Sequence, residues 1–229
     1  MRQAAIQNFR DFRGRYGDSL LTVLTVLLMV MMFVIAPLQA TFDGSLWHFA
    51  LPVALLMILT ALVISGSFVA TTLMIFAFGL NVVVAANQLR GLPGDLDLHL
   101  LALSWLINSL TLGVVVARAV FAEGRVSYHR IVGSILLYLL IALAFVALYL
   151  AVGLMADHAF NNLAIEDGPE LAGRLIYFSC ATLTTLGYGD IAPVHPLARS
   201  LSNLEAICGQ LYPAILIARV VTLHVQGGR

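Results

Sequence analysis

The segment Thr184–Asp190, with the sequence TTLGYGD, holds the residues whose chemistry is most specific in this chain. It is short and polar, and it lies between two apolar stretches. Its side chains form no nucleophile, base or metal-ligand set, so its chemistry must come from backbone carbonyl oxygens. Gly187 and Gly189 allow the positive φ angles that turn successive carbonyls toward one side. A row of such oxygens can replace the hydration shell of a cation.

Long apolar elements must position this segment. Of the 229 residues, 61% are hydrophobic and only 10% are charged, a composition that excludes an ordinary soluble domain. A helix needs about 20 apolar residues to cross a bilayer. The sequence therefore predicts an all-α membrane protein with six transmembrane helices, Leu20–Leu38, Leu46–Ile64, Phe68–Ala86, Leu98–Ala117, Ile131–Ala156 and Leu201–Val225.

A shorter apolar stretch, Leu171–Leu183, leads directly into the segment Thr184–Asp190. It is too short to cross a membrane, which predicts a re-entrant helix that enters and turns back. The arginines set the orientation, because cytoplasmic loops carry an excess of basic residues. With the N-terminus inside, the outer segments hold only Arg90, Arg174 and Arg199, and the re-entrant segment opens to the outer face.

The hexapeptide from Thr185 to Asp190 resembles the selectivity filter of the potassium channel family, and the resemblance extends from about Ile131 to Leu223. It implies K⁺ ions bound by the carbonyls of Thr185, Leu186, Gly187 and Tyr188, with Gly189 completing the filter. The family usually has valine where Leu186 stands. One chain carries one such loop, so we expect a homotetramer with fourfold symmetry.

The apolar runs and the arginines predict the organisation of the N-terminal part, and the resemblance implies that of the pore domain. We expect a basic cytoplasmic arm over residues 1–18, a four-helix transmembrane domain over 19–121 and a pore domain over 122–229. The pore domain is expected to contain an outer helix over 131–156, a pore helix over 171–184, the filter over 185–190 and an inner helix over 197–225.

Four residues are predicted to support the filter, namely Thr184, Asp190, Tyr177 and Glu205. By spacing, the Tyr177 hydroxyl reaches Asp190 behind the filter. Some bacterial members pair a pore-helix glutamate with that aspartate, but Ala181 stands at the matching position here. Glu205 is the only acid inside a predicted span, where an ionisable group is costly unless it has a partner. Either it bonds Ser179 or Thr182, or it lies hydrated at the outer mouth.

Gly209 occupies the hinge position of the family's inner helix. It is either a bending point or a small residue that permits close helix packing. Gln210, Pro213 and Ile217 follow at helical spacing and are predicted to line the cavity below the filter and to form the gate. Pro213 is expected to kink the helix.

The predicted function is passive, potassium-selective conduction. No arginine lies between Asp97 and Arg118, so the fourth span lacks a voltage sensor's charges and voltage dependence should be weak or absent. Two alternatives stay open: a non-selective cation channel of the same architecture, and a transporter or sensor in which the pore loop is structural. Enzymatic activity has no support. The expected partners are K⁺, lipid and further copies of the chain, without a cofactor. The expected location is a bacterial cell membrane, with both termini cytoplasmic.

Overall fold

The computed structural model describes residues 19–41, 67–90, 95–121, 128–168 and 170–227. The predicted basic arm, residues 1–18, and the predicted second span, Leu46–Ile64, lie outside the described residues. Everything said below of the fold concerns the described ranges.

Within these ranges, five helices are long and apolar enough to cross a membrane. The first, Ser19–Leu38, is helical from residue 19, passes through the π-helical turn η1 (Met31–Ile35) and continues as α2 (Ala36–Thr41). The others are α4 (Phe68–Leu89), α5 (Asp95–Val120), α6 (Tyr128–Met155) and α8 (Pro196–Gly227). The fold is therefore that of an all-α membrane protein.

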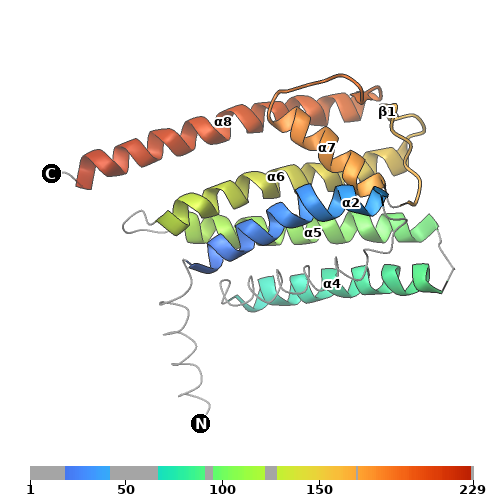
Figure 1. The fold of residues 1–229 in the computed structure, drawn as a ribbon, viewed down its shortest axis with the longest axis horizontal. Coiled ribbons are helices and arrows are strands. Elements are labelled where there is room, and N and C mark those ends of the chain that lie inside the picture. The colour runs from blue at the N-terminus through green and yellow to red at the C-terminus, as the bar shows by residue number, and fades with distance from the viewer. Residues whose placement is uncertain (1–18, 42–66, 91–94, 122–127, 169, 228–229) are drawn as a thin grey trace, which may run out of the picture.

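The helix α7 (Leu171–Leu183) has 13 residues. At a rise of about 1.5 Å per residue it covers about 20 Å, too little for a hydrocarbon layer of roughly 30 Å. Figure 1 shows α7 held between α6 and α8, with the loop at its C-terminal end running back over α8. It therefore has the length and position of a re-entrant helix.

The helix α6 is the centre of the described structure. It packs on α5, α7 and α8, and α4 lies on the far side of α5 (Figure 1). Its residues contribute to both hydrophobic clusters: one also includes the first span and α5, and the other joins α5 to α7. Of the apolar window of α6, 56% is buried, whereas α8 has only 11% buried. A single chain thus leaves most of an apolar helix uncovered.

A two-residue ladder closes the loop that follows α7. The strand β1 (Phe160–Asn161) pairs antiparallel with β2 (Ala192–Pro193), so that Phe160 lies opposite Pro193. The backbone amides of Val194 and His195 also donate to the Ala159 carbonyl, at 2.9 and 3.1 Å. These contacts attach the segment after Asp190 to the loop that follows α6.

Candidate functional site

The backbone of the glycine loop alternates in handedness. Thr185, Gly187 and Gly189 have positive φ angles of 59°, 53° and 81°, whereas Leu186 and Tyr188 between them do not. This alternation turns consecutive carbonyl groups toward a common side. Thr185 adopts a conformation that costs a non-glycine residue roughly 1–3 kcal/mol, which indicates that the surrounding structure imposes it.

The end of α7 holds this loop in place. The amides of Leu186 and Gly187 both donate to the Ala181 carbonyl, at 2.8 and 3.1 Å, and the Thr185 amide donates to Thr182 at 3.0 Å. These carbonyls belong to the last helical turn, which has no amide partners within its own helix. The Thr184 hydroxyl donates to the Cys180 carbonyl at 2.7 Å. The loop therefore starts at a helix C-terminus, whose partial negative charge favours a nearby cation.

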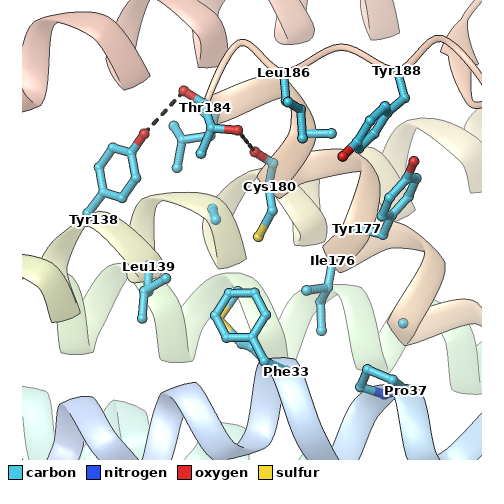
Figure 2. Close-up of a pocket in the computed structure, with 15 residues that line it drawn as sticks. Phe33, Pro37, Tyr138, Leu139, Ile176, Tyr177, Cys180, Thr184, Leu186 and Tyr188 are labelled. Atoms are coloured by element: carbon cyan, nitrogen blue, oxygen red, sulfur yellow. Dashed lines mark hydrogen bonds between the residues drawn. The ribbon is translucent and has the colours of Figure 1, made fainter.

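Side chains behind the loop support its outer half. The rings of Tyr177 and Tyr188 stack at 6.2 Å with an interplanar angle of 4°, and Figure 2 shows them face to face. The Tyr177 hydroxyl interacts with the Asp190 side chain, the partner that the sequence spacing predicts. Asn162 Nδ2 donates to the Asp190 carbonyl at 2.9 Å, a contact that the sequence did not indicate.

The loop faces solvent in the single chain. Every residue from Thr184 to Asp190 is exposed, including Leu186 at 56% and Tyr188 at 67%. A row of carbonyls exposed on one side supplies only part of the oxygen shell that a dehydrated cation needs.

Gln210 lies at the start of this row. Its amide nitrogen Nε2 donates to the hydroxyl Oγ1 of Thr185 at 3.0 Å. The sequence predicted Gln210 as a cavity-lining residue of the inner helix, and the structure places it in direct contact with the loop.

Glu205 is fully buried, with 0% of its surface exposed. The Tyr149 hydroxyl donates to its Oε2 and the Ser179 hydroxyl to its Oε1, both at 2.5 Å. The interpretation of Glu205 as a hydrated residue at the outer mouth is therefore wrong. Thr182 is not its partner either, because the Thr182 hydroxyl donates to the Phe178 carbonyl in its own helix.

Tyr149 was missed by sequence reasoning. It lies on α6, is fully buried and packs against Phe145, Phe160 and Phe178. A tyrosine inside an apolar helix needs a partner for its hydroxyl, and this was the available signal. Through Tyr149 and Ser179, Glu205 joins α6, α7 and α8 at one point behind the loop.

Comparison with known proteins bears on the same part of the chain. Residues 134–226 match the family described as "Ion channel". The chain is 37% identical over 79 residues to the inward rectifier potassium channel Kirbac3.1 of Paramagnetospirillum magnetotacticum, which covers 34% of this chain and 24% of that protein. It is 28% identical over 112 residues to the two pore potassium channel a of Oryza sativa subsp. japonica, covering 49% of this chain and 29% of that protein.

Residues 134–226 are therefore similar to ion channels, and two of the relatives are potassium channels. The apolar helices make the chain a multi-pass membrane protein, and the matched part resembles ion channels rather than enzymes. It is also 31% identical over 87 residues to Protein LctB of Bacillus caldotenax, covering 37% of this chain and 64% of that protein. The chain thus spans about a quarter to just under two thirds of the length of these relatives. No solved structure matches the channel significantly.

The helix α8 lies very close to the end of α7 at Gly209. A Cβ atom added there would lie 1.8 Å from the Leu183 carbonyl oxygen and 2.7 Å from its carbon. Of the two interpretations of Gly209, close packing therefore has a direct structural cause. The Tyr138 hydroxyl donates to the same Leu183 carbonyl at 3.2 Å (Figure 2), and Tyr138 stacks on Tyr212 of the inner helix at 5.7 Å.

The C-terminal part of α8 extends away from α7 (Figure 1). The helix α8 is continuous through Pro213, and Ile217 is 64% exposed. Two groups connect this part to the rest of the channel: the Tyr212 hydroxyl donates to the Ser134 carbonyl at 2.8 Å, and Arg219 lies over the ring of Phe121 at 4.4 Å.

An apolar cavity of about 350 Å³ lies on the flank of the filter loop. Phe33 and Pro37 of the first span form one wall, Ile176 and Cys180 of the pore helix form another, and Tyr188 reaches it from the loop (Figure 2). The cavity therefore separates the first span from the back of the loop.

Proposed function

We propose that this chain forms a potassium-selective channel in which four copies surround one pore. The observation that carries the proposal is the alternating handedness of Thr185, Gly187 and Gly189 in a fully exposed loop. Four such loops around an axis place rings of carbonyl oxygens from Thr185, Leu186, Gly187 and Tyr188 around a dehydrated K⁺ ion.

Two further observations support assembly of copies. The apolar window of α8 is only 11% buried in one chain, and exposed large side chains follow it, Leu204, Ile207, Leu211 and Ile215. Contiguous apolar surface of this kind marks an interaction surface. A closed ring of four copies, with one type of contact between neighbours, covers this surface on every copy.

The remaining sequence expectations complete this proposal. Residues 19–121 form a transmembrane domain beside the pore domain of residues 122–229, and residues 1–18 lie on the cytoplasmic leaflet of a bacterial membrane. Both termini are cytoplasmic, which places the filter entrance outside. The pore helix, the outer helix and the inner helix are then α7, α6 and α8.

Ion selectivity is tested with purified protein reconstituted in planar bilayers. With K⁺ on one side and Na⁺ on the other, we expect the reversal potential to approach the equilibrium potential of K⁺. A reversal potential near zero contradicts K⁺ selectivity and supports the non-selective cation channel. In detergent, the particle should have four times the protein mass of one 24.7 kDa chain.

The transporter alternative is tested with Gly187→Ala. Gly187 has a φ of +53°, a conformation that a side chain strains even though nothing lies within 4 Å of an added Cβ. We expect the substitution to abolish K⁺ flux into liposomes. Gly79→Ala is the matched control, because Gly79 also has nothing within 4 Å of an added Cβ but lies in the helix α4. Unchanged flux in Gly187→Ala would indicate transport through another part of the chain.

A further inference from the structure

The contact between Gln210 and Thr185 joins the inner helix to the first residue of the filter. Gln210 Nε2 lies 3.0 Å from Thr185 Oγ1, across 25 positions of sequence, and both residues are exposed in the single chain. The Thr185 hydroxyl lies at the end of the carbonyl row that is nearest to α8. The effect of the contact therefore depends on how this hydroxyl is oriented.

The Thr185 hydroxyl has one proton to donate and two lone pairs to accept with. It donates the proton to the Thr184 carbonyl at 2.7 Å. The amide of Gln210 donates to the oxygen and occupies one lone pair. The second lone pair is left for a further ligand. Both hydrogen bonds turn the hydroxyl proton toward the backbone and away from any cation beside the oxygen.

The position of Gln210 is imposed by the backbone. Its neighbour Gly209 brings α8 so close to Leu183 that an added Cβ would lie 1.8 Å from the Leu183 carbonyl oxygen. Leu183 in turn lies two residues before Thr185. Because both partners are fixed to this tight contact, the amide of Gln210 reaches the hydroxyl without depending on a flexible segment.

We propose that Gln210 is a positioning residue for the cation site at the inner end of the filter, where it holds the Thr185 hydroxyl oxygen toward a dehydrated monovalent cation. This inference rests on the proposed function. It assigns to Gln210 a direct role in ion binding, in addition to the cavity-lining role that its helical position suggests.

The test uses Gln210→Met, which keeps the side-chain length and removes the donor. The probe is Ba²⁺ applied from the cytoplasmic side, a divalent cation close to K⁺ in radius that blocks by binding in the K⁺ path. We expect the Ba²⁺ concentration for half block to rise roughly tenfold, the effect of losing one hydrogen bond of ordinary net strength. The control is Gln88→Met, because Gln88 also donates through its amide, to the exposed Asp167.

A double-mutant cycle separates positioning from a general structural effect. In a Thr185→Val background, which lacks the hydroxyl, Gln210→Met should leave Ba²⁺ block unchanged. Additive effects of the two substitutions, or wild-type block in Gln210→Met, would overturn the proposal.

Purified protein gives a second measurement that does not need an open pore. K⁺ should raise the unfolding temperature of the wild type more than Na⁺ does, and Gln210→Met should reduce this difference. A wild type without K⁺-selective current and without K⁺-dependent stabilisation refutes the proposed function itself. If the wild type shows both the current and the stabilisation, and Gln210→Met shows the same stabilisation by K⁺ as the wild type, only the role of Gln210 is refuted.

Discussion

Gly209 shows how a single residue fixes the distance between two helices. The helix α8 touches the end of α7 at a separation that only a residue without a side chain permits. The family resemblance suggested a bending point at this position, but the contact explains the glycine without any motion. Gly209 and Glu205 lie four positions apart, so both connect the same stretch of α8 to the pore helix.

Replacing Gly209 with alanine should therefore destabilise the channel. The new Cβ would meet the Leu183 backbone at 1.8 Å, and backbone cannot move aside as a flexible side chain does. Overpacking of this kind costs on the order of 1–3 kcal/mol. Thermal unfolding in detergent should show a clearly lower midpoint, whereas Gly79→Ala should leave it equal or slightly higher. Equal midpoints for both variants would contradict the packing role.

Glu205→Ala should also lower the unfolding midpoint. It removes the hydrogen bonds that join Tyr149 of α6 and Ser179 of α7 to α8. The two hydroxyls keep other acceptors, Ser202 and the Ala142 carbonyl, so each lost bond should cost about 0.5–1.5 kcal/mol. Glu166→Ala is the control, because Glu166 is an exposed acid in the outer loop. If the two variants unfold at the same temperature, Glu205 does not hold the three helices together.

At the level of elements, Gly209 and Pro213 together weaken one turn of α8. Pro213 has no amide proton, so the Gly209 carbonyl four residues earlier lacks its helical donor. Missing this bond, the helix is easier to bend between the part that packs on α7 and the part that extends beyond it. The gate residues predicted from sequence, Pro213 and Ile217, lie at and below this turn.

Pro213→Ala restores the missing bond and should stiffen α8. We expect the fraction of time that single channels are open to change, while the reversal potential in mixed K⁺ and Na⁺ stays the same. Pro196→Ala is the matched control, since Pro196 is the first residue of α8, where a missing amide proton costs nothing. An altered reversal potential in Pro213→Ala would place its effect in the filter instead.

Some of these elements were predictable and some were not. Long apolar runs and the short one at Leu171–Leu183 locate the helices, because membrane thickness sets a length that sequence displays directly. The pairing of Phe160 with Pro193 was not predictable, since two-residue strands show no periodicity. Nor was the partnership of Tyr149 with Glu205, because it depends on how three helices pack. The contact of Gln210 with Thr185 was hidden for the same reason.

For the whole molecule, the distribution of charge limits how it can be controlled. A voltage sensor moves several charges through the membrane, each contributing about 2.3 kcal/mol per 100 mV. Between Asp97 and Arg118, α5 carries no arginine or lysine. The helix α5 therefore has little positive charge to move.

We expect conductance to change by less than a factor of e for each step of about 25 mV. A channel with several gating charges changes far more steeply. The measurement is the conductance of many channels between −150 and +150 mV, in roughly equal steps, in symmetrical K⁺. Steep activation would show that charges outside α5 act as a sensor.

The two amides that share the Ala181 carbonyl have a mechanical consequence. The amides of Leu186 and Gly187 donate to one oxygen atom, and that atom belongs to α7. Neither peptide can be pulled outward alone, because releasing one shifts the acceptor of the other. Any narrowing or widening of the loop must then move the loop and the end of α7 together. The amide protons of Leu186 and Gly187 should therefore exchange with solvent at matching rates.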